Sequence, residues 1–272
     1  MIQLIKKVIK KVLNKTGYEL VNKNFKEAQN ISKIDEATKK ITDIIPFLVK
    51  SGTTDKQAWD FISFAGKKIM NSKAQVMQDL FVLFQLGEKK NGFFIEFGAT
   101  NGIYLSNTFL LEKEYQWSGI LAEPGKIWNV DLFKNRSCII DTRCVWNKTG
   151  DNLTFNETLN PEISTINSYS SNDSLSNARK KGVTYNVETV SLNDLLEQHN
   201  APYEIDYLSI DTEGSEYDIL SSFDFNKYSI KIITVEHNFS PNRIEIYNLL
   251  YANGYKRVFE TISLYDDWYV KQ

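Results

Sequence analysis

The sequence lacks the features of a membrane-spanning or secreted protein. No stretch of its 272 residues approaches the ~20 consecutive apolar residues that a membrane span requires. The N-terminus has neither the apolar core nor the small-residue cleavage site of a secretory signal. Only two cysteines occur, Cys138 and Cys144, so a cysteine-ligated metal site has little support; reduced thiols are predicted, with a disulfide left open. We therefore expect a cytoplasmic protein.

Phosphate-binding motifs are also absent. The sequence contains no GxxxxGK[ST] loop and no GxGxxG loop. Its formal net charge of -2 gives no reason to expect nucleic acid as a partner. A composition with 42% hydrophobic and 24% charged residues is that of a soluble globular protein. The length suits one α/β domain with an appendage, or two small domains.

The first segment stands out by its charge. Isoleucines recur there at helical spacing while lysines crowd the other side, and no acidic residue appears before Glu19. A basic amphipathic helix of this kind can lie on an anionic membrane surface. The alternatives are a solvated lysine face on a docked helix, or an oligomer contact. We predict an N-terminal helical extension over residues 1–74, with residues 1–16 as a candidate contact with the inner face of the membrane, where the protein would be peripheral.

From residue 75 to residue 272, strand-like and helix-like segments alternate. This alternation predicts an α/β domain with a parallel, doubly wound sheet. Ser191, followed by Asp194 at capping-box spacing, predicts the start of one helix. The alternation breaks over a segment of about residues 156–183, which is rich in Ser, Asn and Thr and contains little that could be buried. We predict a polar loop there, either a lid over the active site or a plain surface insertion.

Acidic residues and glycines gather where the predicted strands end. Glu96 lies inside an apolar strand and is followed by Gly98 and Gly102 before a helical pattern resumes. A buried carboxylate is costly unless it is paired or hydrogen-bonded, and open parallel sheets bind ligands at the carboxyl ends of their strands. Basic residues are almost absent from these ends, which argues against a phosphate-rich ligand.

Glu123 narrows the class of ligand. It lies roughly 20 positions after the glycine loop, at the end of the next predicted strand, where an acidic residue can accept hydrogen bonds from two ribose hydroxyls. A ribose-bearing ligand with a positive charge and no phosphate fits an acidic pocket, and S-adenosylmethionine is such a ligand. NAD remains an alternative, although its pyrophosphate would face Glu96 and a poorer glycine loop.

Four segments resemble the FkbM-type family of S-adenosylmethionine-dependent methyltransferases: FIEFGATNG, GILAEP, Cys144-Val145-Trp146 and IDYLSIDTEGSEYDIL. The resemblance covers about residues 74–270, and its most specific part is the D-x-E-G-x-E run that starts at Asp211. It implies a Rossmann-like methyltransferase fold, in which we expect a seven-stranded, mostly parallel sheet flanked by helices. It also implies O-methylation of sugar, polysaccharide or natural-product hydroxyls. One departure is Glu96, where the family often has Asp.

The resemblance further implies which residues contact S-adenosylmethionine. The glycine loop would line the methionine part, and Glu123 would hold the ribose. Cys144 and Val145 would border the adenine, while Asp211 and its neighbours would face the reacting methyl group. The predicted cofactor-binding residues are Glu96, Gly98, Asn101, Gly102, Glu123, Cys144, Val145 and Asp211.

Methyl transfer to a hydroxyl needs alignment of the two reactants and a group that takes the hydroxyl proton. His237 follows a predicted buried strand, and its unperturbed pKa of ~6.5 suits a base at neutral pH; capping of a loop is the alternative. The predicted catalytic residues are His237, Asp211, Glu213 and Glu236. The three carboxylates could instead bind Mg²⁺. A divalent metal is not favoured and no metal ligand is assigned, because the cofactor could occupy Asp211.

These observations predict a methyltransferase that uses S-adenosylmethionine to methylate a hydroxyl of a sugar or surface-polysaccharide precursor. One alternative is an NAD(P)-linked sugar oxidoreductase or epimerase, against which stand the missing GxGxxG loop and the missing Tyr-x-x-x-Lys pair. The other is a non-catalytic binding module on the same fold.

Overall fold

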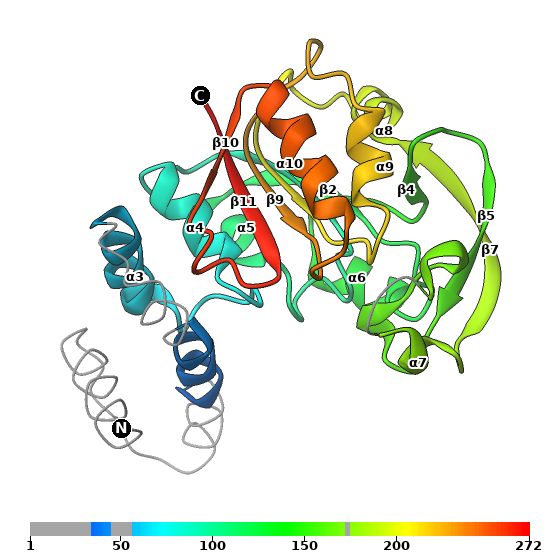
Figure 1. Ribbon diagram of the computed structural model, residues 1–272, viewed down its shortest axis with the longest axis horizontal. Helices are drawn as coiled ribbons and strands as arrows, with labels where there is room; N and C mark the ends of the chain where they lie inside the picture. The colour runs from blue at the N-terminus through cyan, green and yellow to red at the C-terminus, as the bar shows by residue number, and fades with distance from the viewer. Residues whose placement is uncertain (1–33, 45–55, 172–174) are drawn as a thin grey trace.

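The computed structural model describes residues 34–44, 56–171 and 175–272. The predicted membrane contact of residues 1–16 lies outside these ranges. Within the predicted extension, residues 34–44 and α3 (Lys56–Lys68) are helical and lie to one side of the sheet (Figure 1). In the described ranges, no helix combines the length and the apolar character needed to cross a membrane.

A seven-stranded sheet of order β10-β11-β9-β8-β1-β2-β3 forms the centre of the molecule (Figure 1). Its strands are β1 (Phe93–Phe97), β2 (Ser118–Ala122), β3 (Ile139–Asp141), β8 (Glu204–Ile210), β9 (Ser229–Glu236), β10 (Tyr255–Val258) and β11 (Asp266–Lys271). Neighbouring strands from β3 to β9 are parallel, and β11 runs antiparallel to both of its neighbours. The sheet is therefore mixed rather than purely parallel, and the prediction of a mostly parallel sheet is confirmed.

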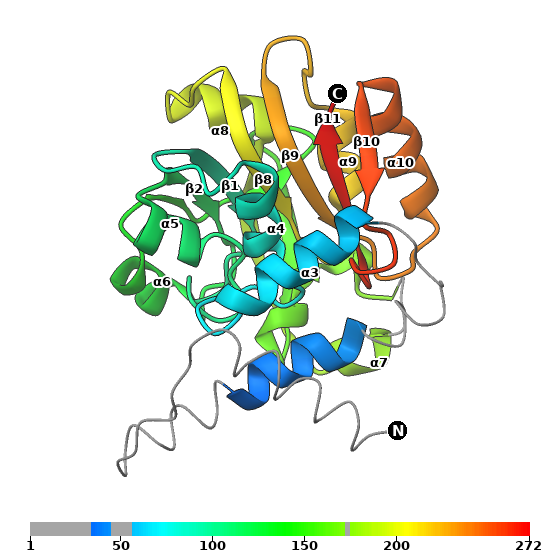
Figure 2. The same ribbon diagram turned by 90° about the vertical axis from the view of Figure 1, so that its left-hand side faces the viewer.

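Helices cover both faces of this sheet, because the central strands bury side chains on both sides. Along β1, Phe94 belongs to one apolar core and Ile95 to the other. The first core is completed by α3 together with α4 (Gln78–Gln85), α5 (Phe109–Tyr115) and α6 (Asn129–Asn135). The second is completed by α8 (Leu192–Gln198), α9 (Glu216–Ser221) and α10 (Asn242–Ala252). Figure 2 shows α3 lying across α4 on the first face. At the predicted start of α8, the amide of Asp194 donates to Ser191 Oγ at 3.1 Å, as the spacing predicted.

The polar segment predicted as a loop contributes instead to a second, four-stranded sheet of order β4-β7-β5-β6. The strands of this second sheet are β4 (Cys144–Trp146), β5 (Asn152–Glu157), β6 (Thr165–Ile166) and β7 (Val183–Ser191). Three short helices lie between them in the chain: η1 (Pro161–Ile163), η2 (Asn167–Tyr169) and α7 (Ser176–Arg179).

The prediction that this segment buries little is wrong. Arg179 is only 1% exposed, and its guanidinium lies 2.6 Å from a carboxylate oxygen of Glu213. The hydroxyl of Thr165 donates to the carbonyl of Glu213 at 3.0 Å. Polar side chains can be buried when each finds a partner, and composition alone does not reveal such partners. These two contacts hold the second sheet against the loop that follows β8.

Candidate functional site

The register of the central sheet brings four strand ends together. Phe97 of β1 pairs with Ala122 of β2 and with Ile210 of β8, and Ile210 pairs with Val235 of β9. The residues that follow these paired positions are Gly98, Glu123, Asp211 and Glu236. The order of strands also reverses between β1 and β8, which is where open α/β sheets bind their ligands. The sequence-predicted residues thus meet at the topological switch point.

Glycine is required at position 98 because two segments of the backbone approach each other closely at this point. Its φ is +76°, and a Cβ atom there would lie 2.0 Å from the carbonyl oxygen of Asp211. A side chain at this position would therefore collide with the backbone after β8, besides being strained.

A first cavity opens at these strand ends. Its lining includes seven of the sequence-predicted residues: Gly98, Glu123, Cys144, Val145, Asp211, Glu213 and Glu236. Apolar side chains from both sheets, among them Phe97, Phe155 and Ile166, form another part of the wall. Among the described residues that line this cavity, none is Lys, Arg or His. The first cavity is therefore acidic and partly apolar.

Glu123 is held in the cavity wall by backbone donors. One carboxylate oxygen accepts from the amide of Thr100 at 2.9 Å and the other from the amide of Gly125 at 2.7 Å. Burial raises the pKa of Glu123 to about 7, against the effect of these two amides; the nearby Asp211 and Glu157 raise it further. The two hydrogen bonds fix the direction in which the carboxylate faces the cavity.

Three other predicted residues, Glu96, Asn101 and Gly102, do not line the cavity. Glu96 accepts hydrogen bonds from the amide of Asn107 at 2.6 Å, from Ser106 Oγ at 3.0 Å and from the hydroxyl of Thr108. Its carboxylate also lies 3.6 Å from the guanidinium of Arg136. The negative charge of Glu96 is therefore compensated by partners within the protein.

Asn101 and Gly102 shape the loop above Glu96. The side-chain oxygen of Asn101 accepts from the amides of Ile103 and Tyr104, at 3.0 and 2.8 Å. A Cβ atom on Gly102 would lie 2.5 Å from Cγ of Arg136. Both residues thus order the turn between β1 and α5 from outside the cavity.

Asn107 lines the first cavity and was not predicted from the sequence. Its side chain is 6% exposed, and its Nδ2 donates to Ser209 Oγ at 2.9 Å. Its Oδ1 atom is buried without a hydrogen-bond partner in the described protein. A buried acceptor without a donor is costly, so this atom points to a ligand with a donor group.

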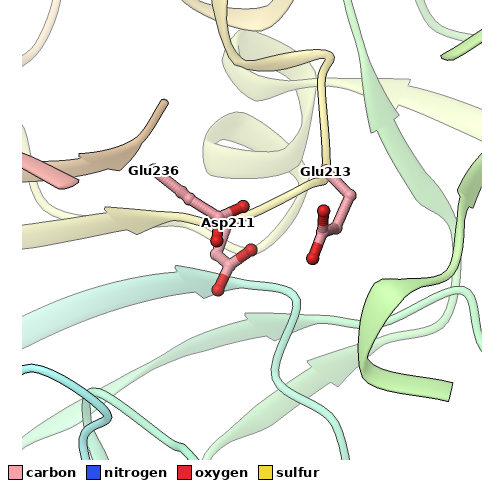
Figure 3. A group of neighbouring side chains, drawn as sticks. All are labelled: Asp211, Glu213 and Glu236. Atoms are coloured by element: carbon pink, nitrogen blue, oxygen red, sulfur yellow. The ribbon is translucent and has the colours of Figure 1, made fainter. Parts of the chain in front are cut away.

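Asp211, Glu213 and Glu236 form an acidic group at the boundary of the first cavity (Figure 3). One oxygen atom from each carboxylate lies within 4.8 Å of the others. Burial raises the pKa of Asp211 to about 7 and that of Glu236 well above its usual value, and in Glu236 the charge of Asp211 adds to the effect. Two carboxylates this close cannot both ionise easily.

A second cavity shares Glu213 and Glu236 with the first. The rest of its lining is mainly polar: Tyr169, Gly214, Glu216, His237, Asn238, Ser240, Pro241 and Asn242. The structure therefore places His237 in this second cavity and not in the first.

The ring of His237 is constrained within the second cavity. Its Nδ1 accepts from the amide of Phe239 at 3.0 Å, and its Nε2 lies 3.7 Å from the carboxylate of Asp267. Burial lowers the pKa of His237 to about 4, although Asp267 opposes the shift. The imidazole is neutral at pH 7.

Two buried arginines support the site and were missed by sequence reasoning. Arg136 links Glu96, Glu112 and the Gly102 carbonyl, and Arg179 binds Glu213. No local pattern identifies them, since Arg136 follows a short helix and Arg179 lies in the polar segment. Their partners are far away in the chain, and only the fold brings them together.

Comparisons with known proteins identify the family to which the chain belongs. The family model described as "Methyltransferase FkbM domain" matches residues 96–263. No curated protein matches the chain. Among solved structures, the chain is similar to the precorrin-6y C5,15-methyltransferase of Geobacter metallireducens GS-15, with a TM-score of 0.37 and 9% identity over 71% of this chain and 85% of that chain. That likeness is too weak to support further conclusions, whereas the family match spans more than half of the chain and includes the strand ends described above. The chain belongs to the FkbM methyltransferase family.

Proposed function

We propose that this protein is an S-adenosylmethionine-dependent O-methyltransferase that acts on a hydroxyl of a sugar or surface-polysaccharide precursor. The observation that carries the proposal is the first cavity at the switch point. It combines carboxylates with an apolar wall, and its described lining contains no cationic side chain that would favour a phosphate. A cofactor with a ribose, an adenine and positive charge fits such a lining.

Individual residues support this assignment of the cofactor. Glu123 faces the cavity in a fixed direction and has lone pairs for ribose hydroxyls. Cys144 and Val145 contribute apolar wall for the adenine. The unpartnered Oδ1 of Asn107 can accept from the ammonium of the methionine part. Glu96, Asn101 and Gly102 would act indirectly, by ordering the loop that carries Gly98 and Thr100.

The second cavity is the proposed site of the acceptor. When bound, S-adenosylmethionine supplies an electrophilic methyl group on a sulfonium. Transfer of that methyl group to an acceptor oxygen would require the protein to take up the hydroxyl proton. Because Glu213 and Glu236 line both cavities, a hydroxyl at the boundary would reach the acidic group.

Asp211 is better suited to take that proton than His237. The pKa of Asp211, raised by burial to about 7, suits a base near neutral pH. In His237, one ring nitrogen already accepts a backbone amide, and its lowered pKa makes it a weaker base. His237 would then shape the acceptor cavity.

A sugar acceptor is supported by the polar lining of the second cavity and by the FkbM resemblance. Its described lining offers hydroxyl, amide and carboxylate groups, which suit a polyhydroxylated ligand. The basic amphipathic pattern of residues 1–16 supports a location beside membrane-bound precursors.

Isothermal titration with S-adenosylhomocysteine and with NAD tests the cofactor. We expect saturable binding of S-adenosylhomocysteine and none of NAD; the reverse would favour an oxidoreductase, and binding of neither would favour a non-catalytic module. Mass spectrometry of the host's surface glycan, with and without this protein, tests the acceptor. A methyl group that persists when the protein is removed would contradict the proposed substrate.

A further inference from the structure

Glu236 differs from the other buried acidic side chains. Within the described residues, the other buried carboxylates each accept a hydrogen bond from a protein donor. Glu236 is 8% exposed and accepts none; its one polar contact is the carboxyl group of Asp211. A buried carboxylate without a donor is unfavourable, so the arrangement points to a positively charged ligand.

The geometry of the three carboxylates fits a metal ion. Their nearest oxygens lie within 4.8 Å of one another. Hard divalent cations bind oxygen ligands at roughly 2.0–2.6 Å, so ligands of one ion are at most about 5 Å apart. Figure 3 shows the carboxylates of Asp211 and Glu236 close together, with that of Glu213 to one side.

The charges also match a divalent cation. Glu213 is paired with Arg179 at 2.6 Å, and Asn238 Nδ2 lies 3.3 Å from the same carboxylate oxygen. Arg179 thus offsets charge on Glu213, whereas no cationic side chain among the described residues forms an ion pair with Asp211 or Glu236. No other cationic side chain lies among the described residues that line the first cavity.

We propose that Asp211, Glu213 and Glu236 bind a divalent cation such as Mg²⁺ or Mn²⁺ at the boundary between the two cavities. This boundary is the position from which a cation can polarise a hydroxyl in the acceptor cavity. The binding of the cation does not depend on methyl transfer, so this proposal and the proposed function can fail separately.

Isothermal titration of the full-length protein, after treatment with a chelator, tests the site with MgCl₂ or MnCl₂ as the only ligand. We expect one cation per chain in the wild type and binding weakened by roughly tenfold or more in Glu236→Gln and in Asp211→Asn. Glu162→Gln is the matched control, because Glu162 lines the first cavity outside the acidic group. It should bind the cation as the wild type does.

Paramagnetic resonance of Mn²⁺ provides a second readout on the unmodified protein, which covers the case in which a variant fails to fold. Loss of the free Mn²⁺ signal at one equivalent supports the proposal. Absence of saturable binding in the wild type, equal binding in Glu236→Gln, or equal loss in Glu162→Gln would overturn it. Asp211 and Glu236 would then be a carboxyl pair that shares a proton.

Discussion

Two groups of buried or half-buried acidic side chains lie near the carboxyl ends of the central strands, and their surroundings differ. Around Glu96, the protein supplies a guanidinium, two hydroxyls and a backbone amide. Asp211 and Glu236 contact each other, and no other donor to either carboxyl group is found among the described residues. The first group has its partners inside the fold and stabilises a loop. The second lies open to two cavities and is available to ligands.

Removal of Arg136 should have the largest effect on this contrast. Arg136→Met would leave Glu96 buried without its cation and would leave Glu112 with Lys113 alone, which should lower the free energy of unfolding by about 3–5 kcal/mol. Urea denaturation measures the change. Lys148→Met, which breaks an exposed ion pair with Asp151, is the control and should cost less than about 1 kcal/mol. Equal losses in the two variants would mean that Glu96 is not held by Arg136.

The surroundings of Glu123 are intermediate between those of the two groups, since this carboxylate has backbone donors but no cationic partner. Its pKa is raised from 4.5 in the unfolded chain to about 7, so its protonated form stabilises the fold. That stabilisation is fully present below pH 4.5 and is lost as pH rises through about 7. Over this window the free energy of unfolding should fall by about 3 kcal/mol more in the wild type than in Glu123→Gln. Urea titrations of the cofactor-free protein in chelator, over a pH series, measure the slopes; parallel profiles would refute the assignment.

Asn107 is the neutral counterpart of Glu236, a buried acceptor without a donor. Asn107→Ala should weaken the binding of S-adenosylhomocysteine by roughly tenfold, which is about 1.4 kcal/mol, because it removes the amide side chain of Asn107 from the lining of the first cavity. Ser209→Ala removes the same internal hydrogen bond but keeps Oδ1. Isothermal titration should therefore find nearly normal affinity in Ser209→Ala. Similar losses in both variants would make the role of Asn107 structural.

The smallest effect is expected for the stability of Glu236→Gln. Burial and the charge of Asp211 raise the pKa of Glu236, so ionisation of this side chain opposes folding as the pH rises. A neutral amide should leave the free energy of unfolding in chelator unchanged, or raise it by about 1 kcal/mol. The matched change Glu96→Gln, at a carboxylate that is paired inside the fold, should lower the free energy of unfolding. A large loss of stability in Glu236→Gln would show that Glu236 has a structural role like that of Glu96.

Much of the fold could be predicted from local pattern. Apolar strands that alternate with periodic helices predicted an α/β domain with a mostly parallel sheet, and Ser191 with Asp194 predicted the start of α8. The polar segment was the failure, since its composition did not indicate β6, α7 or the burial of Arg179. Burial of a polar residue depends on partners that are distant in the sequence.

For the site, the sequence by itself determined which chemical groups are present: carboxylates and glycines at successive strand ends, with hardly a cation among them. The FkbM resemblance was also readable from those segments. Only the tertiary structure decided which of these groups face a cavity. The register of β2, β1, β8 and β9 sets Glu123, Gly98, Asp211 and Glu236 side by side. Glu96 does not join them in the cavity wall. It is paired with Arg136 instead, because a buried carboxylate binds the nearest cation and donors that the fold supplies.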